Sequence, residues 1–304
     1  MIEAGPVLVG FLGAAVRVAT PLLLAATGET VTERAGVINL GLEGMMLAGA
    51  LAATMGTTAA GPGAGIACAV LAGMVLAAGF ALVTIGARAN QIITGTAVTL
   101  GTVGLTGTIY RQVYGPGGAG LGLTTLQPVA IPGLYRVPLL GPVFFNQPLP
   151  TYVALAAVPI IWWFLFRTRT GLALRATGEA AAMARAAGVR TSLLRTLATV
   201  VGGAFAGLAG ATLVLAQVGT FAEKMTAGRG YVAIAIVVLG GWHPLGVALA
   251  SLLFGAATAL QFLFQVMGLK LPYQLFLMLP YGLTLLALAG VVGRARAPGD
   301  LGKQ

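Results

Sequence analysis

Long apolar runs alternate with short charged segments along this chain of 304 residues. A helix needs about 20 mostly apolar residues to cross a bilayer, and two of the charge-free runs, 44–87 and 230–269, are long enough for two crossings each. The pattern predicts an all-α, polytopic helical membrane protein with about nine transmembrane helices, in a range of eight to ten. The predicted spans are 5–27, 36–57, 62–85, 91–109, 151–166, 196–217, 229–241, 245–267 and 273–292.

Helices fit these unbroken runs better than a barrel, whose strands would show alternating segments of about ten residues. Residues 1–27 lack a basic segment ahead of the apolar stretch and are followed by more spans. We therefore interpret them as the first helix rather than a cleavable signal. The whole chain, 1–304, is predicted to be a single transmembrane domain.

The composition removes most classes of enzyme. Hydrophobic residues make up 58% of the chain and charged residues only 8%, against roughly 25% charged in a soluble domain. One His, one Cys, one Asp and two Ser cannot supply a buried catalytic triad or a zinc site. A nucleotide-binding P-loop is also missing from the sequence. We expect no catalytic residue, no metal and no cofactor.

The net charge of +10 predicts an orientation in the membrane rather than a nucleic-acid partner. Eleven Lys and Arg lie in segments that can share one side, and five lie in segments on the other. Cytoplasmic loops carry the excess of basic residues in membrane proteins. The bias therefore predicts an external N-terminus and a cytoplasmic C-terminus.

Two connections are too long to be simple links between helices. The external loop 110–150 holds seven of the 15 prolines and several aromatic residues, which suits either a docking surface or a stiff cap over the helix ends. The internal segment 167–195 carries six Arg, and its small apolar residues recur at helical spacing. It predicts an amphipathic helix of about four turns, ended by Gly188. Such a helix could lie on lipid headgroups or bind a protein partner.

Two charges fall inside predicted spans. Glu43 follows Asn39 by four residues, which would place both on one face of the second helix. An acid in a span is a functional candidate, although a structural carboxylate bonded to a neighbouring helix is the alternative. Arg17 needs a partner or a water-filled cavity, and Glu43, Glu29 or Glu33 could pair with it.

Polar and small residues mark two further helices. The fourth span opens with Gln91 and Thr94 and continues with more threonines; these side chains could line a path for a polar solute or bond neighbouring helices. Small residues that let helices approach closely recur in two stripes, which are Gly203 with Gly207, and Gly101, Gly104 and Gly107.

Three segments resemble one known family. Residues 32–45, TERAGVINLGLEGM, are similar to permease subunits of bacterial ABC importers of the branched-chain amino acid, ribose and nucleoside superfamily, in its nucleoside and simple-sugar branch. The stretch 171–189, GLALRATGEAAAMARAAGV, resembles the superfamily's ATPase-coupling segment, and 230–246, GYVAIAIVVLGGWHPLG, a third marked region. The chain departs from the coupling pattern at 180–183, where small alanines and Met183 stand.

The resemblance implies a bacterial cell-membrane protein with separate partners. These would be a cytoplasmic ABC ATPase, an external lipid-anchored solute-binding protein and a second permease, either a paralogue or another copy. The coupling segment lies within 167–195, and the coupling contacts would map onto Arg175, Gly178, Glu179, Ala187 and Gly188.

The function expected from this resemblance is import of nucleosides or related simple sugars by alternating access, driven by ATP hydrolysis on the partner. Hydrogen bonds to ribose hydroxyls need amide and carboxylate groups, so Asn39, Glu43, Gln91 and Thr94 are the predicted residues of the substrate path. The alternative is a self-sufficient secondary transporter or channel, in which Glu43 would be the coupling acid.

Overall fold

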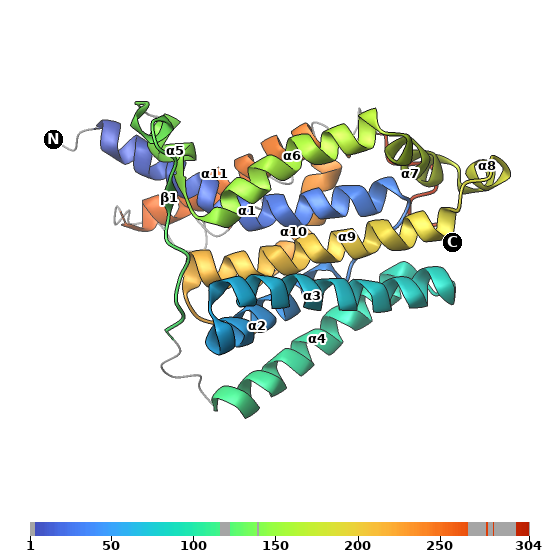
Figure 1. Ribbon diagram of the computed structural model, residues 1–304, viewed down its shortest axis with the longest axis horizontal. Helices are drawn as coiled ribbons and strands as arrows, with labels where there is room; N and C mark the ends of the chain where they lie inside the picture. The colour runs from blue at the N-terminus through green and yellow to red at the C-terminus, as the bar shows by residue number, and fades with distance from the viewer. Residues whose placement is uncertain are drawn as a thin grey trace.

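The computed structural model describes residues 4–115, 122–138, 140–266, 278, 282 and 296–303. Within these ranges the regular elements are helices and one pair of two-residue strands, and most long helices run side by side (Figure 1). In chain order the elements are α1 Ala4–Arg34, α2 Leu42–Ala60, α3 Pro62–Ala81, η1 Leu82–Gly86, α4 Gln91–Tyr114, β1 Val129–Ala130, η2 Leu134–Arg136, α5 Leu140–Phe144, β2 Asn146–Gln147, α6 Leu149–Arg167, α7 Arg169–Glu179, α8 Ala181–Ala186, α9 Thr191–Thr212, η3 Leu213–Val218, α10 Arg229–Leu239 and α11 Pro244–Val266.

A multi-pass membrane protein is confirmed, while the count of nine spans stays a prediction. Six helices of the described chain are long and apolar enough to cross a bilayer. Helix α2 has 19 residues and is not among these six, and α10 has only 11, too few to span the hydrocarbon core. The predicted span 273–292 falls almost wholly outside the described residues.

The predicted start of the second helix is wrong. Helix α1 continues past position 27 to Arg34, and α2 begins only at Leu42. Gly36 has φ +90°, a left-handed conformation that glycine adopts at little cost and that commonly ends a helix. Residues 35–41 therefore form a turn, and Asn39 lies in that turn rather than on one helical face with Glu43.

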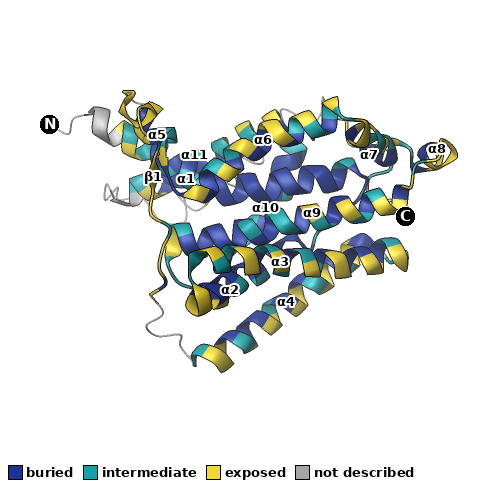
Figure 2. Cartoon of the chain, viewed as in Figure 1, coloured by how far each residue is buried: buried dark blue, intermediate teal, exposed yellow. Residues whose placement is uncertain are grey.

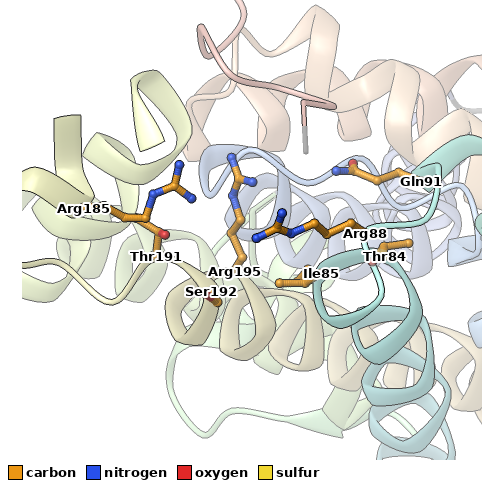
Figure 3. A pocket seen from close by; sticks show the side chains of 8 residues that line it. All are labelled: Thr84, Ile85, Arg88, Gln91, Arg185, Thr191, Ser192 and Arg195. Carbon is orange, nitrogen blue, oxygen red and sulfur yellow. The ribbon is translucent and has the colours of Figure 1, made fainter. Parts of the chain in front are cut away.

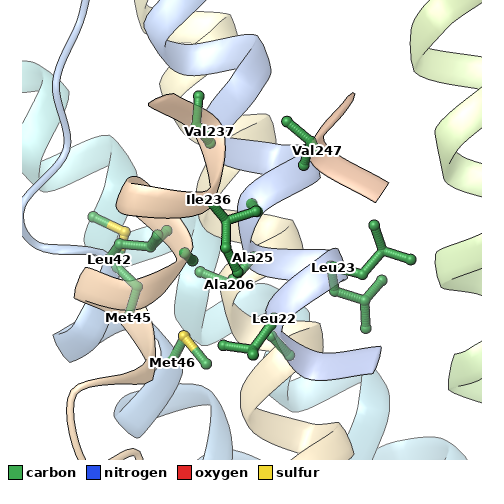
Figure 4. Close-up of a cluster of buried hydrophobic side chains, with 14 of the residues drawn as sticks. Leu22, Leu23, Ala25, Leu42, Met45, Met46, Ala206, Ile236, Val237 and Val247 are labelled. Carbon is green, nitrogen blue, oxygen red and sulfur yellow. The ribbon is translucent and has the colours of Figure 1, made fainter. Parts of the chain in front are cut away.

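Helix α9 occupies the centre of the bundle, between α1 on one side and α3 on the other (Figure 1). The buried residues gather on α1, α2 and α9, whereas α4 and the outer face of α6 are largely exposed (Figure 2). The main cluster of buried side chains joins α1, α2, α9 and α10 (Figure 4), and includes Leu22, Met46, Ala206 and Ile236.

Glycines allow the central helices to touch backbone to backbone. A Cβ atom on Gly73 would collide with the carbonyl oxygen of Gly203, and one on Gly49 would lie 2.6 Å from the Cα of Gly207. The predicted Gly203 and Gly207 stripe is thus a packing face. The second stripe is not packed in the same way, because a Cβ at Gly101 or Gly104 meets nothing within 4 Å among the described residues.

The described part of loop 110–150 contains short ordered elements. Strand β1 pairs antiparallel with β2, and the buried Gln147 donates from Nε2 to the carbonyl of Val143 at 2.6 Å and, more weakly, to that of Gly13 at 3.4 Å. Tyr152 on α6 donates its hydroxyl to the Val129 carbonyl at 2.7 Å. These bonds attach the loop to the ends of α1 and α6 as a cap, and its role as a docking surface stays a prediction.

Candidate functional site

The turn 35–41 is held by buried side chains from α1 and α4. Glu29 is fully buried and accepts a hydrogen bond at Oε1 from the backbone N–H of Asn39, 3.0 Å away. Gln91, the first residue of α4, accepts at Oε1 from the N–H of Ile38 at 2.8 Å. Buried backbone N–H groups need acceptors, and those of Ile38 and Asn39 have none within a helix. The two side chains supply these acceptors and so hold the turn in place.

Glu43 caps a helix from a distant part of the chain. It is 7% exposed, and its two carboxylate oxygens accept from the N–H groups of Gly228 at 2.8 Å and Gly230 at 2.6 Å. These donors lie at the start of α10, where backbone N–H groups have no partner within the helix and a negative charge is favourable. The contacts fit the structural alternative for Glu43.

The other residues of the predicted substrate path are only partly brought together. Asn39 is fully buried; its Oδ1 accepts from the N–H of Gly41 at 3.0 Å, and its Nδ2 lies 3.3 Å from Sδ of Met45. Gln91 contacts the same turn, and Thr94 follows it half-buried on α4. Asn39 thus lies in the turn that Gln91 contacts from α4, while Glu43 is bonded to the start of α10.

The expected pairing of Arg17 is absent from the described residues. No ion pair joins its guanidinium to Glu29, Glu33 or Glu43 there, and its backbone carbonyl accepts from Nε2 of Gln217 at 2.7 Å. Glu33 instead accepts a hydrogen bond from the indole N–H of Trp242.

The predicted coupling segment folds as two helices rather than the predicted single one. Helices α7 and α8 meet at Ala180, whose φ of −155° and ψ of 84° lie outside the helical region. Gly188 follows α8 with φ +84°, in the helix-ending position predicted for it. Arg175 donates from Nε to the Leu165 carbonyl at 2.9 Å.

Gly178 joins the coupling segment to α1. A Cβ there would collide with the carbonyl oxygen of Arg34, so α7 touches the end of α1 directly. Arg34 also donates from Nε to the carbonyl of Trp242 at 2.8 Å. Burial and the neighbouring Arg34 cation lower the pKa of His243, in the turn after α10. One end of the bundle therefore joins α1, α7 and the turn after α10.

The C-terminal tail, residues 296–303, packs against the same end. The N–H of Ala181 donates to Oδ2 of Asp300 at 2.7 Å, and the N–H of Asp300 donates to the carbonyl of Gly178 at 2.8 Å. The pKa of Asp300 is lowered, chiefly by the bond from Ala181 and further by Lys303. On its other side, the tail's Gly302 donates to the carbonyl of Gly36 at 3.1 Å. The tail connects the break at Ala180 to the turn 35–41.

A family profile described as the branched-chain amino acid transport system, permease component, matches residues 11–288. The chain belongs to this permease family. The resemblance carried by residues 32–45, 171–189 and 230–246 is therefore confirmed.

Curated relatives cover most of this permease. It is 43% identical over 271 residues (86% of this chain and 80% of the relative) to the putative glucose ABC transporter permease protein TsgC13 of Haloferax volcanii. It is 34% identical over 290 residues to the guanosine ABC transporter permease protein NupQ of Bacillus subtilis, and 33% over 292 residues to the nucleoside ABC transporter permease protein NupC of Lactococcus lactis, each covering 92% of this chain and 91% of the relative. No solved structure matches the permease.

The sequence interpretation missed two structural contributions to the permease's site. The predicted first span ends at 27, so Glu29 and Glu33 lie outside it and are expected only as partners of Arg17. The string Glu33-Arg34-Ala35-Gly36 carries a basic residue in a last turn followed by glycine, which is a helix-ending signal. Asp300 gives no such signal, because Ala181 and Gly178, which it bonds at the break, lie more than 100 residues away.

Proposed function

We propose that this permease is the membrane-spanning subunit of an ATP-driven importer for nucleosides or related simple sugars. Support for the cargo class comes from the relatives, whose names specify guanosine, nucleosides and glucose. ATP would be hydrolysed on a separate cytoplasmic ABC ATPase. A solute-binding protein, anchored to lipid outside the cell, would deliver cargo, and a second permease, a paralogue or another copy, would complete the pathway.

The observation that carries this proposal is the connection between the coupling segment and α1. Helices α7 and α8 lie at one end of the bundle, with α8 extending beyond the neighbouring helices (Figure 1). Glu179, Ala187 and Gly188 are exposed there, while Gly178 is buried against the end of α1. Force from an ATPase docked on the exposed residues would reach α1 through Gly178, with Arg175 holding α7 to the end of α6.

The proposed orientation places α7, α8 and the C-terminal tail in the cytoplasm. The six arginines of 167–195 and the basic residues of the tail then lie on one side, as expected for a cytoplasmic surface. Loop 110–150 would face the outside, where cargo arrives.

In the proposed path, Asn39, Glu43, Gln91 and Thr94 have different roles. The carboxylate of Glu43 and the amide of Asn39 are bonded to the protein, which suits residues that hold the path in shape. Thr94 is half-buried and no hydrogen bond of its side chain competes with cargo in the described chain. We assign it, with the free part of the Gln91 amide, to direct contact with sugar hydroxyls.

Reconstitution with the co-purified ATPase and binding protein tests the mechanism. Proteoliposomes would be assayed for ATP-dependent uptake of labelled guanosine, uridine, ribose and glucose. The Gly178→Ala substitution should abolish ATP-driven uptake, because its Cβ collides with the Arg34 carbonyl. Gly79→Ala is the matched control, since a Cβ at Gly79 meets nothing within 4 Å.

Uptake of one of the nucleosides or sugars that needs ATP and fails only in Gly178→Ala would support the proposal. Transport of the cargo by the chain alone, without ATP or ATPase, would contradict it. That result would favour the second candidate, a secondary transporter or channel, and Glu43→Gln would then be expected to stop transport.

A further inference from the structure

A basic pocket opens at the same end of the bundle, between η1, the start of α4, α8 and α9. It has a volume of about 330 Å³ and is lined by three arginines, Arg88, Arg185 and Arg195, together with Gln91, Thr191 and Ser192. Figure 3 shows the three guanidinium groups directed toward a common space. No acidic side chain is among the residues that line it. Such a concentration of positive charge favours an anion.

Two of the three cations have no partner in the described chain. The guanidinium groups of Arg88 and Arg185 donate no hydrogen bond and form no ion pair there. Arg195 is 8% exposed and is held by bonds from Nε to the Ala35 carbonyl and from Nη1 to the Lys303 carbonyl, both at 3.2 Å. Asp300, nearby on the tail, is bonded to Ala181 and Lys303. A guanidinium group often binds a phosphate through two parallel N–H···O hydrogen bonds, so the pocket suits a phosphate.

The backbone at Arg88 is held in an uncommon conformation. Arg88 has φ +56°, a region that side chains other than glycine rarely occupy. It lies two residues after the end of η1, Leu82–Gly86, a π-helical segment. Strained residues and π-helical turns occur often at functional sites. The Arg88 guanidinium lies at the pocket (Figure 3).

An apolar groove of about 470 Å³ continues from the basic pocket along α3. It shares Ile85, Arg88 and Ser192 with the pocket, and adds Ala78, Ala81 and Leu82. Leu82 is 72% exposed, so the groove faces the outside of this chain. A basic pocket that adjoins an apolar groove matches a phospholipid, in which an anionic phosphate is joined to hydrocarbon chains.

We propose that the pocket and groove form a binding site for one anionic membrane phospholipid. Its phosphate would lie between Arg88, Arg185 and Arg195, and its hydrocarbon chain in the groove beside Ala78 and Leu82. Basic pockets between transmembrane helices on the cytoplasmic side commonly bind anionic lipid heads. Only the choice of the cytoplasmic leaflet rests on the proposed function. Because Arg185 lies on α8, the lipid would bridge the coupling segment to α3 and α9.

Native mass spectrometry of the full chain in detergent tests this site. The probes are phosphatidylglycerol, phosphatidylcholine and inorganic phosphate, added separately and in competition. We expect phosphatidylglycerol to bind in preference to phosphatidylcholine. Arg88→Gln with Arg185→Gln should weaken that binding about tenfold or more, because two charge-assisted contacts are lost. Arg167→Gln with Arg169→Gln removes the same charge from the same end and should change binding less than about twofold.

A groove variant separates a lipid from a soluble anion. Ala78→Phe should weaken binding of phosphatidylglycerol by filling the groove, with no effect on inorganic phosphate. Equal binding of the two lipids, or equal loss in the two arginine variants, would overturn the proposal. So would complete displacement of the lipid by an equal concentration of inorganic phosphate, which would show that the groove adds nothing, or its displacement by the co-purified ATPase. Lipid binding is measured without cargo or ATP, so a failure of the proposed transport function would be seen separately.

Discussion

The carboxylate of Asp300 accepts a hydrogen bond from the backbone N–H of Ala181, 2.7 Å away across 119 residues of chain. Ala181 is the first residue of α8, and Ala180 before it breaks the helical path. The side chain from the tail therefore satisfies a donor that the break leaves without a helical partner. The geometry of the coupling segment depends in this way on a residue far from it in sequence.

Replacing Asp300 should loosen the α7–α8 junction. In Asp300→Ala the N–H of Ala181 loses its acceptor, and a surface hydrogen bond of this kind contributes roughly 1 kcal/mol. Hydrogen exchange at the Ala181 amide should then speed up about fivefold. Lys303→Ala is the control, because its exposed ion pair with Asp300 contributes little. Unchanged exchange in Asp300→Ala would show that the tail does not stabilise the junction.

Docking of the tail should weaken in acid. The bond from Ala181 and the charge of Lys303 hold the pKa of Asp300 below its usual value. A lowered carboxyl pKa means that docking is fully stabilised above the undocked value of about 3.9 and loses that contribution as pH falls through the docked pKa. The protection factor of the Ala181 amide, which is its intrinsic exchange rate divided by the observed rate at the same pH, should therefore fall below about pH 4. Asp300→Asn should remove this dependence, and an identical pH profile in that variant would assign it to another group.

Glu43 should act on stability rather than on proton transfer. Glu43→Ala leaves two buried N–H groups of α10 without an acceptor, and we expect a loss of about 2–3 kcal/mol in the free energy of unfolding, seen as a lower melting temperature in detergent. Gly230→Ala should cost about 1–3 kcal/mol through overpacking, since its Cβ would lie 2.5 Å from the Glu43 backbone. Gly104→Ala, with open space around it, is the matched control.

Transport by a Glu43 variant gives a second test of its structural role. Glu43→Gln keeps one oxygen acceptor and should retain most ATP-driven transport with a smaller loss of stability. A variant that is fully stable but does not transport would contradict the structural role.

The contact between α3 and α9 should be sensitive to a single methyl group. Gly73→Ala places a Cβ against the Gly203 carbonyl, and we expect a loss of about 1–3 kcal/mol in the free energy of unfolding. Gly79→Ala on the same helix has open space and should be neutral or stabilising by up to about 1 kcal/mol. Thermal unfolding followed by circular dichroism would compare them, and equal melting temperatures would exclude close packing at Gly73.

The sequence predicted the helical membrane class and the packing at Gly203 and Gly207, because apolar length and small-residue spacing are local signals. It failed at the turn 35–41, where an apolar run hid a helix end. The predicted first span ends at 27 and leaves the buried Glu29 outside it. An acid interrupts the apolar run there, although the helix continues through it.

The segment predicted to couple to the ATPase could be delimited from sequence, but its contacts could not. The family motif identified residues 171–189, yet the break at Ala180 is stabilised by Asp300, which no local pattern connects to it. The basic pocket also needed the structure, since Arg88, Arg185 and Arg195 come from three separate segments.

Helix α1 has 31 residues, which gives a length of about 46 Å at 1.5 Å per residue. One end touches the coupling segment through Gly178, and the other lies beneath the cap formed by α5 and the strand pair. A rod of this length that tilts by roughly 10° about one end moves its opposite end by about 8 Å. A small rotation imposed at one membrane surface would thus become, at the other surface, a displacement as large as a sugar ring.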